Sequence, residues 1–186
     1  MDLTHANKIV GSIIFSKLET WDDANRSNFF HGGDPGEPTY ANYYRDRLPH
    51  EPSPPILILD KITIKDSLRG QGYGTSAILA FLSKYQSGFD IAFLHVGRES
   101  TSENYEDSKK WRIPWYESLG WQRMELHPTH REYGSPLMWH DLKNIPLDKA
   151  RHIIELRPES AENRLRGDSL DWTRTKAPQA EQDVSD

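Results

Sequence analysis

The chain has 186 residues and no cysteine, which excludes disulfide bonds, thiolate metal sites and cysteine nucleophiles. Its 23 basic and 28 acidic side chains give a formal net charge of -5, so nucleic acid is not an expected partner, because phosphate contacts need clustered basic side chains. No segment reaches the about 18 apolar residues of a membrane span, and the first residues have neither the basic nor the apolar region of a signal peptide. We therefore expect a cytoplasmic protein without a membrane partner.

Apolar periodicity and turn residues divide the chain into elements. The first half is predicted to contain a strand at 8–18, a long ordered loop at 21–55 with one helical turn near 40–48, and a strand at 55–64. A glycine-rich turn, a helix to Tyr85 and a strand at 89–96 follow. The second half is predicted to contain a helix at 103–119 interrupted at Pro114, strands at 121–128 and 135–142, and a closing helix at 146–156. This order predicts an α/β or α+β domain with a central mixed, mostly antiparallel sheet flanked by helices. The domain spans residues 1–156, and the polar segment 157–186 is expected to be a disordered tail.

The strand at 55–64 is expected to alternate its side chains between two faces. The first face would carry Ile58, Asp60, Ile62 and Ile64, and the second Leu57, Leu59, Lys61 and Thr63. Asp60 would then be a carboxylate on an otherwise apolar face.

Three glycines, Gly70, Gly72 and Gly74, lie between this strand and the following helix. Alternating glycines let successive backbone N–H groups point into one concavity, to which the helix N-terminus adds unpaired donors and a positive dipole end. The stretch fits a phosphate cradle and a plain tight connection equally well. It lacks the lysine of a P-loop, and Thr75 stands where the Rossmann fingerprint has its third glycine, so a nucleotide-phosphate enzyme is the weaker hypothesis.

Two boxes in the chain resemble motifs of the GNAT acyltransferase superfamily. The first, RGQGYG at 69–74, is similar to the Arg/Gln-x-x-Gly-x-Gly/Ala loop that holds the pyrophosphate of acetyl-CoA, and the second, WYESLGW at 115–121, is similar to the LYEKLGF box. Their order and the elements between them also match, and the resemblance covers roughly residues 8–142. It implies a GNAT-like fold with acetyl-CoA as acyl donor.

The resemblance also implies which residues bind the cofactor. Backbone groups of Ile62, Thr63 and Ile64 would pair with the pantetheine arm, while the strand that ends near His95 diverges from them. The pyrophosphate would be held by the glycine-rich turn and its neighbours: Arg69, Gly70, Gln71, Gly72, Tyr73, Gly74 and Thr75.

The implied chemistry is direct attack of an amine on the thioester, which needs a base and an acid. Tyr116 matches the tyrosine of the second box and is the expected acid. The base is Asp60, His95 or an ordered water. Asp60 is either a buried carboxylate with a raised pKa or a paired or exposed one. The eight histidines show no metal-ligand spacing, so we expect no metal.

The chain departs from the family before residue 8, where a typical member has a strand, two helices and another strand. Those helices form part of the acceptor wall, so either the loop at 21–55 or a second subunit of a homodimer replaces it, or the site is incomplete. The loop aromatics are expected to form an acceptor lid or a dimer contact: Trp21, Phe29, Phe30, Tyr40, Tyr43 and Tyr44. Deletion of 25–48 would then abolish acceptor turnover and spare cofactor binding.

The leading hypothesis is an N-acetyltransferase whose acceptor is a small-molecule amine or a protein or peptide amine. The alternative is a catalytically inactive GNAT-fold module that binds CoA or a protein partner.

Overall fold

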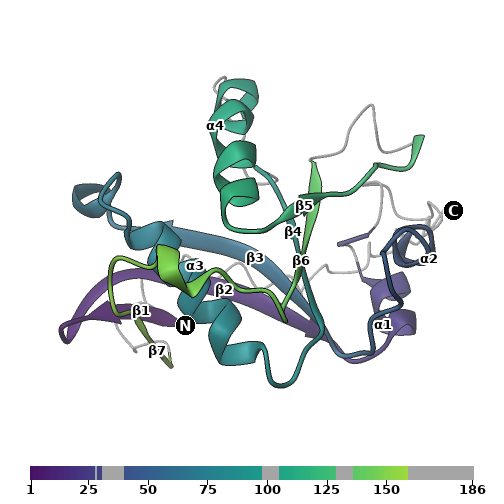
Figure 1. Ribbon diagram of the computed structural model, residues 1–186, viewed down its shortest axis with the longest axis horizontal. Helices are drawn as coiled ribbons and strands as arrows, with labels where there is room; N and C mark the ends of the chain where they lie inside the picture. Colours follow the sequence, from purple (N-terminus) through teal and green to yellow (C-terminus); the bar gives the residue numbers. More distant parts are fainter. Residues whose placement is uncertain (28, 31–39, 98–104, 129–135, 159–186) are drawn as a thin grey trace, which may run out of the picture.

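The structure is a computed structural model that describes residues 1–27, 29–30, 40–97, 105–128 and 136–158. In this part of the chain one mixed sheet has the strand order β5-β6-β4-β3-β2-β1-β7 (Figure 1). Its strands are β1 (Asp2–His5), β2 (Lys8–Leu18), β3 (Ile56–Ile64), β4 (Ile91–His95), β5 (Gln122–Arg123), β6 (Leu137–Asp141) and β7 (Glu155–Arg157). β3 and β4 pair in parallel and the other neighbours pair antiparallel, which confirms the predicted mixed, mostly antiparallel sheet.

The helices pack on or beside this sheet (Figure 1). They are α1 (Trp21–Arg26), α2 (Ala41–Arg45), α3 (Tyr73–Tyr85), α4 (Tyr105–Ser118) and the short 3-10 helices η1 (Asp66–Leu68) and η3 (Leu147–Lys149). α4 runs through Pro114 without the predicted interruption, since the fixed φ of proline is compatible with a helix. No helix in the described ranges is long and apolar enough to cross a membrane.

Two short strands at one side of the sheet were not predicted. β1 forms a hairpin with β2 through Ala6 and Asn7, whose φ angles of 47° and 62° belong to a mirror-image two-residue turn. β7 pairs with β1 in place of the predicted closing helix at 146–156. Within that range only the 3-10 helix η3 forms, and the backbone N–H groups of Arg151 and His152 donate to the Ser76 hydroxyl and not to carbonyls of a helix. Since β7 includes Arg157, the ordered sheet extends one residue past the predicted domain end, and residues 159–186 lie outside the described part.

A β-bulge at Asp60 changes which side chains of β3 share a face. Ile14 is opposite Lys61 and Phe15 is opposite Leu59, so Asp60 is an extra residue in the pairing with β2. The extra residue inverts the alternation beyond it. The predicted face of Ile58, Ile62 and Ile64 was therefore wrong: Ile58 faces one core of the protein, whereas Ile62 and Ile64 pack against the other.

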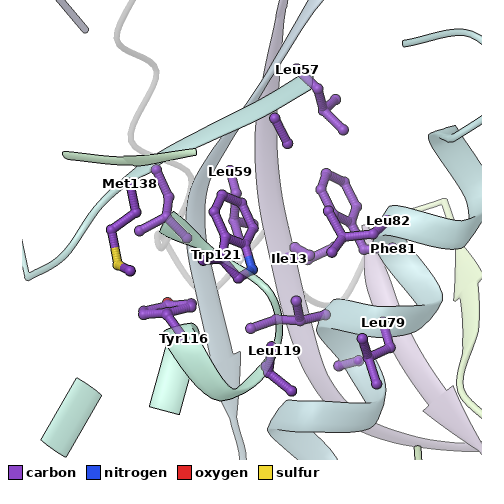
Figure 2. Packing of buried hydrophobic residues seen from close by; sticks show 14 of the residues in the cluster. Ile13, Leu57, Leu59, Leu79, Phe81, Leu82, Tyr116, Leu119, Trp121 and Met138 are labelled. Carbon is purple, nitrogen blue, oxygen red and sulfur yellow. The ribbon is translucent and has the colours of Figure 1, made fainter. Parts of the chain in front are cut away.

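One core lies between the sheet and α3. Figure 2 shows Ile13, Leu57 and Leu59 of the sheet facing apolar side chains of α3. The same cluster includes Tyr116, Leu119, Trp121 and Met138 from α4, the turn that follows it and β6. This core fixes α3 and the C-terminal end of α4 relative to β3.

The described residues of the segment 21–55 form a second core on the opposite face of the sheet. The segment carries two short helices, α1 and α2, where a loop with one helical turn was predicted. Its aromatic side chains pack against the sheet residues Ile58, Phe93 and Trp139, and the buried ones are Trp21, Phe29, Phe30, Tyr40 and Tyr44. The prediction of an acceptor lid or dimer contact was wrong for these five side chains, because burial against the sheet removes them from solvent; Tyr43, the sixth, is half-buried.

Candidate functional site

A cleft opens where β3 and β4 separate. Their parallel pairing consists of Leu57 with Ala92 and Ile58 with Phe93, after which β3 continues along β2 to Ile64 while β4 follows β6 (Figure 1). The space between them has a volume of about 1180 Å³ and is lined by β3, β4, the glycine-rich turn, α4 and the residues around η3. This volume slightly exceeds the usual range of small-molecule sites, roughly 300 to 1,000 Å³, so the cleft has room for a large ligand.

The glycine-rich turn forms one end of the cleft. Gly70 and Gly72 have φ angles of 75° and 87°, in the left-handed region that favours glycine. Gly72 is the N-cap of α3 and offers no side chain to its first amides, so those N–H groups depend on another acceptor. Gly74 has no such φ, and an added Cβ would lie 3.5 Å from the Trp115 ring, an ordinary contact.

The predicted cofactor residues divide into two groups. The cleft lining includes Ile62, Thr63, Ile64, Arg69, Gly70, Gly72, Gly74 and Thr75. Gln71 and Tyr73 do not belong to it: the Gln71 amide donates to the carbonyl of Ser67, and the Tyr73 ring stacks on His152. The guanidinium of Arg69 is paired with Asp66 at 2.8 Å.

Basic side chains outnumber acidic ones around the cleft. Among the described lining residues, the bases are Lys61, Arg69, Arg112, Lys149 and Arg151, and the acids are Asp60 and Asp148. Such a surface suits an anionic ligand even though the whole chain is acidic. Sequence reasoning missed the basic residues of α4 and of the segment around η3, because only the tertiary fold brings them to the glycine-rich turn.

Trp115 connects α4 to the start of α3. Its indole Nε1 donates a hydrogen bond to the Thr75 hydroxyl at 3.0 Å. Because that oxygen accepts from the indole, the Thr75 hydroxyl proton can be donated to a ligand in the cleft. Trp115 therefore positions a residue of the predicted phosphate site, a role that its place in the second box did not suggest.

Tyr116 lies in the buried wall of the cleft. Its side chain is 9% exposed and packs against the rings of Trp115 and Trp121. Burial raises the pKa of Tyr116 to about 12, although the charge of Arg112 opposes this shift. The hydroxyl is therefore protonated over the whole physiological pH range and can donate a hydrogen bond.

Asp60 is exposed at the bulge of β3 and lines the cleft. The hydroxyl of Ser16, on β2, donates to its carboxylate at 2.5 Å. The Asp60 carboxylate is therefore exposed, and the alternative prediction of a buried carboxylate was wrong.

His95, the last residue of β4, connects the cleft to the segment 21–55. Its Nε2 lies 2.9 Å from the carbonyl oxygen of Phe29, and the two rings pack with centroids 4.5 Å apart. A carbonyl oxygen only accepts, so Nε2 carries the proton and Nδ1 is the basic nitrogen of the neutral ring. No group of three or more metal-ligating side chains lies in the described ranges.

The chain has distant similarity to solved structures. No protein-family model matches it, and no curated protein matches it. One similar structure is AtaT complexed with acetyl-methionyl-tRNAfMet, with 16% sequence identity, 75% of this chain covered and a TM-score of 0.41. A mutant of KacT has 16% identity, 73% of this chain covered and a TM-score of 0.40. AtaTR bound with AcCoA has 15% identity, 75% of this chain covered and a TM-score of 0.40. The match spans 66%, 64% and 67% of those chains, respectively. Similarity this distant leaves the function to be argued from the residues of the cleft.

Proposed function

We propose that the chain is a GNAT-type N-acyltransferase that uses acetyl-CoA to acetylate an amine. The observation that carries this proposal is the cleft between the diverging strands β3 and β4, which ends at the glycine-rich turn and the uncapped start of α3. One continuous space thus joins the glycine-rich turn to Tyr116 and to His95, which all line it.

The cleft residues fit the parts of acetyl-CoA. Beyond Ile58, the edge of β3 that faces β4 pairs with no strand of the described ranges, so its backbone groups from Ile62 to Ile64 are suited to pair with pantetheine amides. The amides of the glycine-rich turn and the surrounding basic side chains suit the pyrophosphate. When bound, acetyl-CoA supplies a thioester whose carbonyl carbon forms a bond to the amine nitrogen as its bond to sulfur breaks.

The chain must then remove a proton from the amine and stabilise the sulfur that leaves. His95 Nδ1 or the Asp60 carboxylate is the base, directly or through a water, since both residues line the cleft. Tyr116 donates a hydrogen bond to the sulfur. Full proton transfer is unfavourable, because its pKa of about 12 exceeds the about 8.5 of an ordinary thiol.

The acceptor amine, on a small molecule or on a protein or peptide, would approach from the side of the segment 21–55. Phe29 of that segment holds His95 by a hydrogen bond and a ring contact. We therefore assign to this segment, and not to a second subunit, the positioning of His95 in the cleft.

The alternative, a module that binds CoA without transfer, is favoured by one observation. The high pKa of Tyr116 makes it a poor proton donor to a thiolate. Release of free thiol from acetyl-CoA in a screen of amines separates the two: turnover with any amine excludes the inactive module, whereas binding without turnover favours it.

Calorimetric titration with acetyl-CoA tests the cofactor assignment, with ATP and NAD as comparison ligands. We expect micromolar binding of acetyl-CoA that Gly72→Glu abolishes, because the new carboxylate repels the pyrophosphate and the left-handed φ of Gly72 disfavours any side chain. Gly88→Glu is the matched control, since Gly88 lies outside the cleft and an added Cβ meets nothing within 4 Å. Absence of acetyl-CoA binding, or stronger binding of ATP or NAD, would reject the proposal.

A further inference from the structure

Residues 147–154, here called the strap, cross the start of α3. The backbone N–H groups of Arg151 and His152 both donate to the hydroxyl of Ser76 at 3.0 Å. Ser76 is 1% exposed and lies in the first turns of α3. This hydroxyl therefore fixes the backbone of the strap beside the glycine-rich turn.

Side chains of the strap make further contacts on both sides of this point. His152 Nε2 donates to the carbonyl of Gln71 at 2.9 Å, and its ring stacks on Tyr73 with centroids 3.9 Å apart. Lys149 Nζ donates to the carbonyl of Ser118 at the end of α4. The strap is thus joined to the glycine-rich turn and to α4, the two walls at this end of the cleft.

Arg151 lies directly over the glycine-rich turn. A Cβ placed on Gly72 would be 3.2 Å from Cδ of Arg151, so the stem of this side chain packs over the N-cap of α3. Arg151 lines the cleft and forms no salt bridge with any residue of the described ranges. Arg69, which the sequence pattern favours, is by contrast already paired with Asp66.

We propose that Arg151 binds the pyrophosphate of acetyl-CoA together with the amides of the glycine-rich turn. This inference rests on the proposed function. A guanidinium presents paired N–H donors that match phosphate oxygens, and its charge is available because it has no carboxylate partner in the described ranges. Arg151 lies over Gly72, where the amides of the glycine-rich turn would hold the pyrophosphate. Its ligand is therefore the pyrophosphate and not the 3′-phosphate of the ribose. The strap then determines affinity for the donor without touching the thioester.

The test compares Arg151→Gln with the wild type by calorimetry, using acetyl-CoA and its analogue without the 3′-phosphate. We expect binding of both ligands to weaken by the same factor, roughly tenfold or more, as for loss of a charge-assisted hydrogen bond. Arg151→Lys retains the charge and should weaken binding less. Arg157→Gln is the matched control, because Arg157 follows the strap in β7, bonds Glu155 and Asn7, and does not line the cleft.

Each outcome bears on a different claim. If the wild type binds neither ligand, the proposed function fails and this inference with it. If the wild type binds both and Arg151→Gln binds them equally well, only the role of Arg151 fails. Weakening confined to the ligand that carries the 3′-phosphate would also overturn it. Thermal unfolding shows whether each variant is folded. If Arg151→Gln is unfolded, the comparison of the two ligands is made with Arg151→Lys.

Discussion

The hydroxyl of Tyr116 is the group whose proposed role depends most on its surroundings. Burial keeps it protonated, with a pKa of about 12, in the wall of the cleft. We expect Tyr116→Phe to lower kcat by roughly 100-fold with little change in KM, because a donor to developing charge acts mainly in the transition state. Steady-state kinetics with acetyl-CoA and an identified amine measure both constants. An unchanged kcat would remove Tyr116 from the mechanism.

Two buried tyrosines should make the protein sensitive to alkali. Burial raises the pKa of Tyr44 as well as that of Tyr116 to about 12. Between about pH 10 and 12 the unfolded chain loses these protons while the folded chain keeps them. The free energy of unfolding therefore falls as pH rises, by roughly 2 to 3 kcal/mol per tyrosine over the whole interval. Urea unfolding at several alkaline pH values measures this slope. Tyr44→Phe and Tyr116→Phe should each reduce it, and an equal slope in the variants would contradict the assigned burial.

At the scale of elements, the hydrogen bond from Trp115 to Thr75 joins α4 to α3 at the phosphate end of the cleft. Trp115→Phe removes the donor and keeps an aromatic ring. We expect a loss of about 1 kcal/mol in the free energy of unfolding and several-fold weaker binding of acetyl-CoA, because Thr75 loses its orientation. Denaturant unfolding and calorimetry provide the two values.

Thr75→Ser is the matched control for this prediction, since it retains the hydroxyl that accepts from the indole. Thr75→Ala should reproduce the effect of Trp115→Phe, and combining the two changes should add little. Additive losses in the double variant would show that the two side chains act independently.

For the whole molecule, the described residues of the segment 21–55 contribute to the folded core. Phe30 is 0% exposed and packs against Phe93 of the sheet and Tyr44 of α2. We expect Phe30→Ala to lower the free energy of unfolding by roughly 3 to 5 kcal/mol, as measured in urea. Ile153→Ala, at a side chain that is 83% exposed, should change it by less than about 0.5 kcal/mol.

This arrangement reverses the expectation that deletion of 25–48 spares cofactor binding. The deletion removes Phe29, Phe30 and Tyr44 from the second core, so the sheet should lose its cover and the fold should fail. Cooperative unfolding and acetyl-CoA binding that persist in the deletion variant would show that the second core is dispensable.

The sequence was informative where apolar periodicity is long and uninterrupted. The strand predicted at 55–64 is observed as β3, the one at 89–96 as the shorter β4, and the helix to Tyr85 as α3. Their pattern is set by burial against neighbours, which a single sequence records directly. The glycine-rich turn was also found, because its positive φ angles require glycine at 70 and 72.

Other features depend on contacts that no local pattern records. The hairpin turn of β1 and β2 uses Ala6 and Asn7 without the glycine that usually marks such turns. The bulge at Asp60 does not disturb the pattern of apolar residues in the sequence of β3. The sequence therefore did not reveal that the side chains beyond Asp60 change faces. Arg151 reaches Gly72 only through the strap, whose path depends on the buried hydroxyl of Ser76.

The central claim is that acetyl-CoA binds between β3 and β4, and amide hydrogen exchange with and without acetyl-CoA tests it most directly. The account predicts slower exchange at the amides of 62–64 and 70–75, with exchange in α1 and α2 unchanged, because the ligand covers the open edge of β3 and the start of α3. Protection confined to other segments, or no change in these two, would contradict it.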